Sequence, residues 1–306
     1  MLEIIKIIIY GIIEGITEWL PISSTGHLIL IEEFMNLSVR AEFLEIFRVV
    51  IQLGAILAVV LIYFERLNPF SSHKSADQKQ QTWSTWVKVI IGCIPAGLLG
   101  VLLDDWMDAH LMNWFVVSLA LIVYGIAFIW IENRNAHHAP VVSEMSQLSL
   151  KKAIQIGLFQ ALSLVPGTSR SGSSILGGIL MGASRPVATD FSFFMSIPIM
   201  FGASGYKLLK GLKNGFRFTG HETFLLILGM LVAFLVSLVV IKFLLRYVET
   251  NDFKPFGWYR IILGVLVILW FTRAWLWKVI LTLIVVAAIA FGGFYLYARN
   301  QKTKHE

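Results

Sequence analysis

Residues 14–27 read EGITEWLPISSTGH, and this polar run interrupts an apolar segment that begins at Ile4 and resumes at about Leu28. A second interruption, PGTSRSG at residues 166–172, lies between an apolar limb from about Lys151 to Val165 and one that resumes at about Ser174. A membrane-spanning helix needs about 20 apolar residues, and each limb is shorter or more polar than that. Such a break exposes backbone polar groups at membrane depth, which is tolerated only where it lines a cavity or is buried in protein. The sequence therefore predicts two re-entrant helix–loop–helix hairpins, at about 4–35 and 151–181.

The rest of the chain is also too apolar for a soluble domain. Of its 306 residues, 57% are hydrophobic and 14% are charged, whereas soluble domains carry about 25% charged residues. We therefore expect an all-α polytopic membrane protein, with residues 1–273 forming a single membrane-embedded domain and residues 274–306 adding an extra transmembrane helix and a basic tail. Spanning helices are predicted at roughly 44–65, 86–103, 112–132, 187–209, 222–247, 256–273 and 276–298.

The two predicted hairpins resemble each other in sequence. A shift of 146 positions places residues 11–30 over residues 157–176 without a gap. Gly11 then meets Gly157, Ser23 meets Ser169 and Gly26 meets Gly172. Internal repeats with interrupted helices are typical of proteins that bind a substrate at the interface between the repeats. The polar matches at the breaks predict that both hairpin tips contribute to one site.

The charges of the loops indicate how the chain crosses the membrane. The connections at 66–88 and 133–152 are basic, whereas 104–110 carries three aspartates and no lysine or arginine. Cytoplasmic loops carry the excess of basic residues, so the first two connections are predicted to be cytoplasmic. The first hairpin then enters from outside and the second from inside, which makes the repeats inverted. The basic segment 207–217 falls outside, against the rule.

Because the positive charges lie in short loops, we expect no nucleic-acid partner despite a net charge of +6.

Two acidic residues, Glu14 and Glu18, lie four positions apart in the first hairpin. This spacing places both carboxylates on one face of a helix. Ionisable groups inside a membrane usually face a cavity or a partner and are functional. The pair can hold a divalent cation, since hard cations take oxygen ligands, or one member can act as a base. The alternative is a structural pair near the membrane surface that holds the hairpin by hydrogen bonds.

Three hydroxyl residues and a histidine follow the acidic pair: Ser23, Ser24, Thr25 and His27. A hydroxyl becomes a nucleophile only with a nearby base or metal, and both Glu18 and His27 are within plausible reach. The alternative for one of the hydroxyls is helix capping after the proline of the break. The set favours a reactive centre, with capping by one member.

The second tip carries Arg170 among Ser169, Ser171 and Gly172. The N–H groups at a helix N-terminus form an anion site, and the arginine fork suits phosphate. The alternative is a structural salt bridge to one of the acidic residues of the first hairpin. Gln52 lies at the start of an apolar helix, where packing or capping is the more common role.

These residues resemble a known family. Residues 14–27 resemble the first signature of the bacterial undecaprenyl-pyrophosphate phosphatases, also called the bacitracin-resistance family, and residues 166–172 resemble the second. Gln52 and Pro95, with their neighbours, also fit the family pattern. The resemblance covers about residues 1–272. Family members usually end near Phe271, whereas this chain continues with an apolar run at 275–297.

The resemblance implies hydrolysis of undecaprenyl pyrophosphate to undecaprenyl phosphate and inorganic phosphate. This reaction recycles the lipid carrier for cell-wall synthesis and confers bacitracin resistance. It would take place in the bacterial plasma membrane, with the active site on the extracytoplasmic side. By the resemblance, Ser24 is the nucleophile, Glu14 and Glu18 are the acidic pair, His27 is an acid/base or an alternative nucleophile, and Arg170 is the pyrophosphate clamp.

The resemblance also implies a divalent cation, Mg²⁺ or alternatively Ca²⁺, with Glu14 and Glu18 as its ligands. The expected partners are the polyprenyl pyrophosphate and membrane lipids, and a homodimer is left open. The expected substrate-binding set is Arg170, Ser23, Thr25, Ser169, Ser171, Gly172 and Gln52. A transporter of lipid phosphate or anions is the alternative function, because transporters also have inverted repeats and broken helices. The carboxylates, histidine and hydroxyls beside an arginine favour the enzyme.

Overall fold

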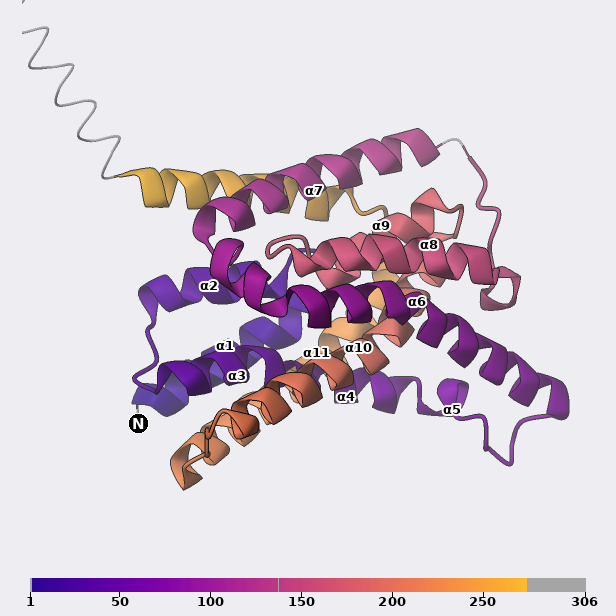
Figure 1. Cartoon of the computed structure of the whole chain (residues 1–306). Coiled ribbons are helices and arrows are strands. Elements are labelled where there is room, and N and C mark those ends of the chain that lie inside the picture. The colour runs from indigo at the N-terminus through magenta and orange to yellow at the C-terminus, as the bar shows by residue number, and fades with distance from the viewer. Residues whose placement is uncertain (1, 137, 274–306) are drawn as a thin grey trace, which may run out of the picture.

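The computed structural model describes residues 2–136 and 138–273, and over these residues the protein is a bundle of helices (Figure 1). A single isolated β-bridge, between Val142 and Ala183, is the only strand-like pairing in these two ranges. The helices are α1 (Leu2–Thr17), α2 (Ser24–Phe34), α3 (Ala41–Val50), α4 (Gln52–Ile62), α5 (Phe64–Leu67), α6 (Ala76–His110), α7 (Trp114–Asn135), η1 (Met145–Gln147), α8 (Leu150–Ala161), η2 (Leu162–Leu164), α9 (Arg170–Leu180), α10 (Arg185–Lys213), α11 (Gly220–Thr250) and a final helix, Lys254–Arg273.

Six helices are long and apolar enough to cross a membrane, and they match six of the seven spans predicted from the sequence. One of them, Ala41–Ile62, consists of α3 and α4 with a short break at Ile51 between them. The seventh predicted span, at 276–298, and the proposed extra segment 274–306 lie outside the described residues. The prediction of an all-helical, multi-pass membrane protein is confirmed.

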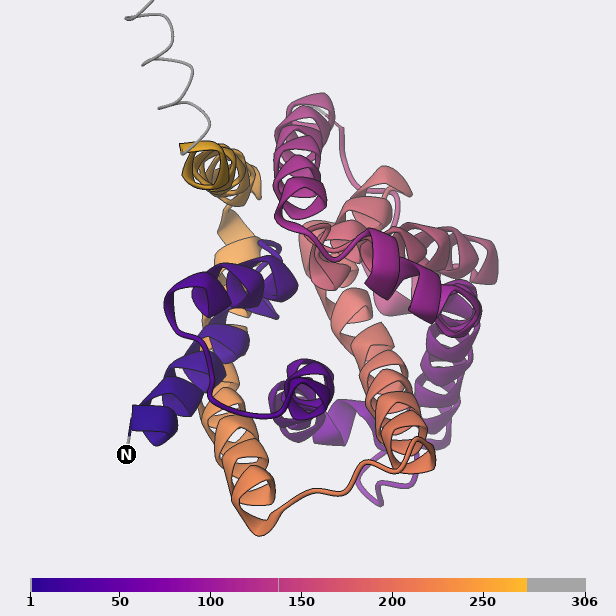
Figure 2. The ribbon, with the colours of Figure 1, turned by 60° about the vertical axis from the view of Figure 1, so that its left-hand side comes forward.

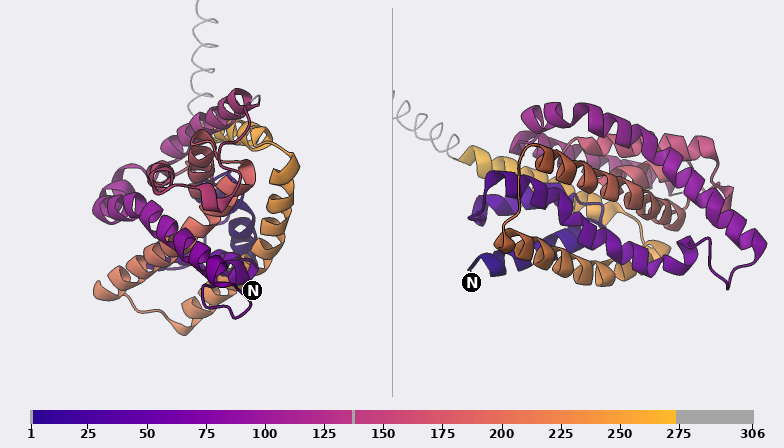
Figure 3. Two further views of the ribbon diagram at one scale, coloured as in Figure 1. Left: turned by 90° about the vertical axis from the view of Figure 1, so that its right-hand side faces the viewer. Right: turned by 60° about the horizontal axis from the view of Figure 1, so that its bottom comes forward.

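The connections between helices gather at two opposite ends of the bundle. What we call the N-terminal end carries Leu2 and the connections that follow α2, α6 and α10 (Figure 1). The opposite end carries α5 and the connection between α7 and α8. Figure 2 brings the N-terminal end toward the viewer, and Figure 3 (right) again shows the two ends apart.

Each helix–loop–helix segment returns to the end from which it starts. In the first, Lys6 Nζ donates to Asn36 O and the Tyr10 hydroxyl donates to Met35 O at 3.2 Å, so the outer ends of α1 and α2 lie together at the N-terminal end. In the second, the Val142 N–H donates to Gly182 O at 2.9 Å, close to where α8 begins at the opposite end. The two tips, which are the breaks at 18–23 and 162–169 together with the first residues of α2 and α9, therefore point toward each other inside the bundle.

The matched glycines of the two segments pack in the same way. A Cβ atom at Gly11 of α1 would lie 2.8 Å from Gly229 O of α11. A Cβ atom at Gly157 of α8 would lie only 2.0 Å from Gly92 O of α6. Glycine lets two helix backbones approach closely within a membrane bundle. The repeated glycine therefore sets how closely each segment's first helix packs on a spanning helix.

The breaks are shorter than the sequence indicated. The returning helices were expected to resume near Leu28 and Ser174, but α2 already begins at Ser24 and α9 at Arg170. Serine side chains make the early start possible, because each caps the first turn of its helix and satisfies an N–H group that would otherwise lack a partner. The expected capping role for one hydroxyl is confirmed, and Ser23 fills it in the first tip.

The basic segment 207–217, read as a loop from the sequence, is mostly helical, because α10 continues to Lys213. The Lys207 ammonium lies 2.7 Å from Asp108 and 3.2 Å from Asp104, and Lys210 lies 2.6 Å from both Asp104 and Asp105. The carboxylates that end α6 thus neutralise these two lysines. These ion pairs involve two of the four basic residues of 207–217, and the charge rule counts basic residues rather than net charge, so the segment remains an exception to it.

Replacing Lys207 by methionine is expected to destabilise the protein by about 1–3 kcal/mol, because Asp104 and Asp108 lose a cation that is 10% exposed. Methionine keeps the apolar length of the side chain. Thermal unfolding in detergent measures the change. Lys210→Met is the matched control, and it should cost less because the lysine is more exposed and Asp105 is largely in water. Equal losses for the two variants would contradict the assignment of Lys207 as the centre of these ion pairs.

Candidate active site

The two tips have the same unusual backbone. Ser23 has a φ of 77° and Ser169 a φ of 75°, and they are the only non-glycine residues with positive φ in the described parts of the chain. Side chains rarely adopt this conformation, and it concentrates at functional sites. Each serine then caps the next helix, since its Oγ accepts from the N–H of Gly26 at 3.3 Å or Gly172 at 3.0 Å. The sequence match at the breaks therefore corresponds to one shared local structure.

The tips meet although they lie about 150 residues apart. Arg170 Nη2 donates to Glu18 Oε1 at 2.8 Å, and the Ser171 hydroxyl donates to the backbone oxygen of Glu18 at 3.0 Å. The Arg170 and Glu18 side chains are 11% and 6% exposed, so water screens the ion pair little. The salt bridge that the sequence offered as the alternative role of Arg170 is present, and Glu18 is its partner.

Glu18 also holds the Ser24 hydroxyl. Ser24 Oγ donates to Glu18 Oε2 at 2.6 Å, so the two carboxylate oxygens bind different partners. A hydroxyl that donates to a carboxylate at this distance is arranged for transfer of its proton. The structure thus brings together a hydroxyl, a carboxylate and a guanidinium, three kinds of group that group-transfer sites use.

A cavity of about 140 Å³ lies between the tips. Ser24, Glu18 and Arg170 line it, and the first turns of α2 and α9 begin at its wall. Helix N-termini and a guanidinium favour a bound anion. The cavity is lined by Glu18, Ser23, Ser24, Thr25, Gln52, Ser163, Pro166, Gly167, Ser169, Arg170, Ile199, Met200 and Ala203.

This polar cavity continues into a larger one. Thr25, Gln52 and Ser163 line both, and the second cavity has a volume of about 580 Å³ and mostly apolar walls, which include Leu28, Ile90 and Leu164. A polar chamber that opens into an apolar one suits a molecule with a charged head and a hydrocarbon tail. Gln52, for which packing was the more common expectation, lies at the junction.

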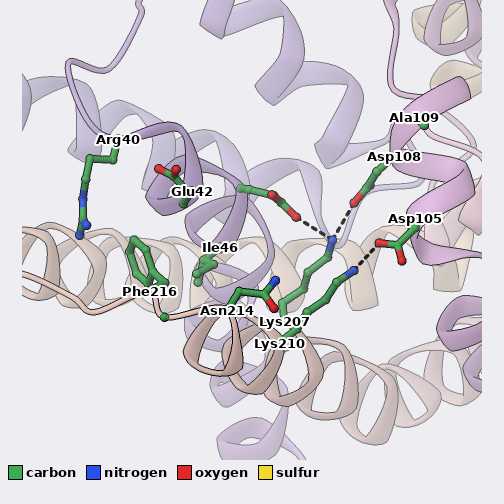
Figure 4. Close-up of a pocket in the computed structure, with 13 residues that line it drawn as sticks. Arg40, Glu42, Ile46, Asp105, Asp108, Ala109, Lys207, Lys210, Asn214 and Phe216 are labelled. Atoms are coloured by element: carbon green, nitrogen blue, oxygen red, sulfur yellow. Dashed lines mark hydrogen bonds and ion pairs between the residues drawn. The ribbon is translucent and has the colours of Figure 1, made fainter.

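The apolar cavity ends at a charged pocket on the N-terminal end. Lys207 and Asp108 line both spaces, and the pocket has a volume of about 700 Å³. Figure 4 shows Lys207 and Lys210 reaching from α10 toward Asp105 and Asp108 of α6. The three spaces therefore lie next to one another, from the N-terminal end to the tips.

Glu14 is one of several buried polar side chains near the tips that lack hydrogen-bond partners; Gln160 is another. Glu14 is completely buried, and neither carboxylate oxygen has a hydrogen-bond partner. A buried carboxylate without partners is costly unless a cation or a proton accompanies it. No group of three or more metal-ligating side chains is present among the described residues. Mg²⁺ commonly takes one or two carboxylates and fills its remaining positions with water and substrate phosphate, so Glu14 and Glu18 are the candidate ligands. Glu14 does not line the polar cavity, however, and the two Glu18 oxygens bond Ser24 and Arg170.

The structure places His27 away from the reacting groups. Its Nδ1 lies 2.7 Å from Ser23 O and its Nε2 lies 2.6 Å from the Tyr259 hydroxyl. The two rings also stack, with centroids 5.7 Å apart. His27 does not line the polar cavity, whereas Ser24, three residues earlier, does. His27 was expected to lie near the hydroxyls of the first tip, but among these residues its ring bonds only the backbone oxygen of Ser23.

The substrate-binding residues expected in the second tip occupy different layers. Ser169 and Arg170 line the cavity, whereas Ser171 is fully buried behind it. The Ser171 hydroxyl lies 3.2 Å from that of Ser169, and Gly172 contributes the capped N–H. Ser171 therefore supports the tip from behind.

Two residues near the tips were not singled out from the sequence. Ser192 of α10 accepts from Arg170 Nη1 through its backbone oxygen at 3.1 Å, and no sequence signal identifies it. Arg260 bonds backbone oxygens of both tips. An arginine inside an apolar span is a recognised functional signal, so Arg260 was detectable.

Known proteins match this chain over most of its length. The family model described as "Bacitracin resistance protein BacA" matches residues 7–266. An "Undecaprenyl-diphosphatase" from Streptococcus mutans is 60% identical over 267 residues, which cover 87% of this chain and 95% of that protein. Proteins with the same name from Enterococcus faecalis and Streptococcus thermophilus are 57% and 56% identical, and the alignments cover 86% and 88% of this chain and 95% and 93% of theirs.

Proposed function

Because the chain belongs to the bacitracin resistance protein BacA family, we propose that it is an undecaprenyl-diphosphatase, which hydrolyses undecaprenyl diphosphate to undecaprenyl phosphate and inorganic phosphate. The reaction returns the lipid carrier to its monophosphate form for cell-wall synthesis, and bacitracin resistance follows from the same activity. The main structural support is the shared bonding of Glu18, which holds the Ser24 hydroxyl and the Arg170 guanidinium at one cavity.

The diphosphate binds in the polar cavity and the isoprenyl chain in the apolar one. Arg170 and the first turns of α2 and α9 hold the terminal phosphoryl group. Thr25, Gln52 and Ser163 lie where the two cavities join, so the phosphate that carries the isoprenyl chain contacts them. The expected substrate-binding set thus divides into residues for the terminal phosphate and residues for the inner phosphate.

In the first step, the Ser24 oxygen attacks the terminal phosphorus. The bond from this phosphorus to the bridging oxygen breaks, and undecaprenyl phosphate leaves. Glu18 takes the hydroxyl proton through the existing 2.6 Å hydrogen bond. Arg170 stabilises the charge on the transferring phosphoryl group, which is the main source of acceleration in reactions of this kind.

In the second step, water hydrolyses the phosphoserine. The water oxygen forms a bond to phosphorus, the bond from phosphorus to the Ser24 oxygen breaks, and inorganic phosphate leaves. Glu18 returns the proton that it took in the first step to the leaving Ser24 oxygen, and the inorganic phosphate keeps the protons of the water. His27 fixes the first tip through Ser23 O and Tyr259, so its role is to position Ser24.

Glu14 and Glu18 would hold the divalent cation, Mg²⁺ by preference and Ca²⁺ as the alternative. When bound, this ion neutralises phosphate charge and so allows an anionic substrate to sit beside two carboxylates. The lack of hydrogen-bond partners for both carboxylate oxygens of Glu14 supports this assignment.

Replacing Glu14 by glutamine is expected to raise the Mg²⁺ concentration for half-maximal activity at least about tenfold, because a charged ligand is lost. Phosphate release measured across a Mg²⁺ titration tests this. Glu249→Gln, at an exposed position on α11, is the control and should leave the titration unchanged. A normal Mg²⁺ titration for Glu14→Gln would remove Glu14 from the metal site.

We further propose that the chain is one catalytic domain, residues 1–273, built from inverted-topology repeats with re-entrant hairpins at about 4–35 and 151–181. The return of each segment to its own end and the paired Ser23 and Ser169 backbones support this architecture. The end with the basic connections 66–88 and 133–152 faces the cytoplasm. The charged pocket at the N-terminal end then opens on the extracytoplasmic side of the bacterial plasma membrane.

The test is phosphate release from undecaprenyl diphosphate by the detergent-purified full chain, with Mg²⁺ and with a chelator. We expect multiple turnovers with Mg²⁺ and loss of activity on chelation. A folded protein that releases no phosphate with Mg²⁺ or Ca²⁺ would refute the phosphatase. Lipid-phosphate transport would then be the function to test, although neither the family nor the relatives' names support it.

A further inference from the structure

Arg260 lies in the first half of the helix Lys254–Arg273, whose other charged residues are at its two ends. Its side chain is fully buried, and no ion pair between the described residues includes it. A buried charge is costly unless its environment compensates it. The compensation must therefore come from uncharged groups around the guanidinium.

Backbone oxygens of both tips provide this compensation. Arg260 Nη1 donates to Pro21 O at 2.9 Å, and Nη2 donates to Gly167 O at 2.8 Å and Thr168 O at 2.9 Å. Two longer contacts, at 3.5 Å, reach Leu121 O and Ala120 O of α7. The carbonyls at a helix break lack the partners that a continuous helix would give them, and one guanidinium satisfies those of both breaks.

The two principal acceptors are equivalent positions. Pro21 and Gly167 are separated by the 146 residues that relate Ser23 to Ser169. The single guanidinium of Arg260 therefore bonds the equivalent backbone carbonyl of each tip. The arginine has this geometry because its nitrogens are held in a rigid plane, whereas a lysine ammonium is a single point on a flexible stem.

We propose that Arg260 is a positioning residue that fixes the separation of the two tips, and thereby the alignment of Ser24 and Glu18 with Arg170. Arg260 does not line the polar cavity, so it touches no reacting atom and acts through the tip backbones. The catalytic part of this inference rests on the proposed function. A displacement of about 1 Å in a catalytic group can lower the rate about 100-fold.

A pair of glycines provides a milder test of the same contact. A Cβ atom at Gly172 would lie 3.3 Å from Arg260 Nη1 and 3.1 Å from Ser169 Cβ. At the equivalent position, a Cβ atom at Gly26 would meet Ser23 Oγ and Val117 Cγ1 at 3.3 Å, and Arg260 is not among its neighbours. Alanine at either position brings its methyl group into tight contact with the tip. Only the Gly172→Ala methyl group also lies within 3.4 Å of Arg260.

The experiment compares the full-length Arg260→Lys variant with the wild type. Amide hydrogen exchange reports on the tips, and hydrolysis of undecaprenyl diphosphate gives kcat and KM. We expect faster exchange in peptides covering both 18–27 and 164–173, and a kcat about 100-fold lower with KM changed less than about threefold. Arg185→Lys is the control, because Arg185 pairs with Glu132 at the opposite end; its tips and kcat should match the wild type.

Unchanged exchange in either tip, or a kcat near that of the wild type, would overturn the proposal. If the wild type shows no hydrolysis but Arg260→Lys loosens both tips, the positioning contact stands and the phosphatase fails. If Arg260→Lys does not fold, the alanine pair decides. Gly172→Ala should then lower kcat about tenfold more than Gly26→Ala, and equal losses would overturn the proposal.

Discussion

The Ser24→Ala variant is expected to hydrolyse undecaprenyl diphosphate at least about 10⁴-fold more slowly than the wild type, because it lacks the oxygen that attacks phosphorus. Substrate binding should change little, since Arg170 and the helix N-termini remain in place. Single-turnover phosphate release measures the loss. Rapid acid quenching of the wild type, followed by mass spectrometry, should identify phosphate on Ser24.

Two comparisons make this result specific. Ser118→Ala removes a buried hydroxyl that bonds only within α7, and it should retain wild-type activity. His27→Ala should lose less activity than Ser24→Ala, because His27 lies outside the polar cavity. Wild-type turnover by Ser24→Ala together with an inactive His27→Ala would instead identify the histidine as the nucleophile.

Replacing Arg170 by alanine is expected to lower kcat/KM by about 10³–10⁵, the range found where an arginine stabilises a transferring phosphoryl group. The change also leaves Glu18, at 6% exposure, without its cation. Two different nitrogens of Arg170 bond Glu18 and Ser192, and a single lysine ammonium cannot make both bonds in the same geometry. Arg170→Lys should therefore recover little of the lost kcat/KM. Steady-state kinetics with undecaprenyl diphosphate measures both variants.

The Arg66→Ala variant is the control for the loss of an arginine from an ion pair. Arg66 bonds Asp190 at 2.6 Å near the opposite end, far along the chain from the tips, and it is absent from the polar cavity. It should therefore retain most of its activity. An Arg170→Lys variant with at least half of the wild-type kcat/KM would show that a single positive charge suffices. It would contradict the claim that two nitrogens of the guanidinium are needed.

The sequence predicted the membrane helices well because a span depends on local composition. A run of about 20 apolar residues is stable in lipid wherever it occurs, and six predicted runs became helices of suitable length. The two breaks were also local signals, since proline, glycine and hydroxyl residues stood where apolar residues were expected. The capping role of a serine followed from the same local rules.

The site was predicted as a set of residues, but its bonding was not. Glu18 and Ser24 were both named, and so was His27, yet the sequence left open which residue serves the hydroxyl. In the structure the Ser24 hydroxyl bonds Glu18 and not His27, because the backbone at Ser23, with a φ of 77°, turns Ser24 back toward that carboxylate. Such a conformation is imposed by surrounding packing and is not encoded in residue type alone.

By itself, the sequence determined that this protein lies in the membrane, where its helices break, and which polar groups gather at each break. These properties depend on how each short segment partitions between water, lipid and its own hydrogen bonds. Only the tertiary structure decided that Arg170 reaches Glu18 across 152 positions, that His27 bonds Tyr259, and that Arg260 joins the carbonyls of both tips. Those contacts arise because helices distant in the chain pack so that buried charges find partners, and no local pattern specifies which partner lies within reach.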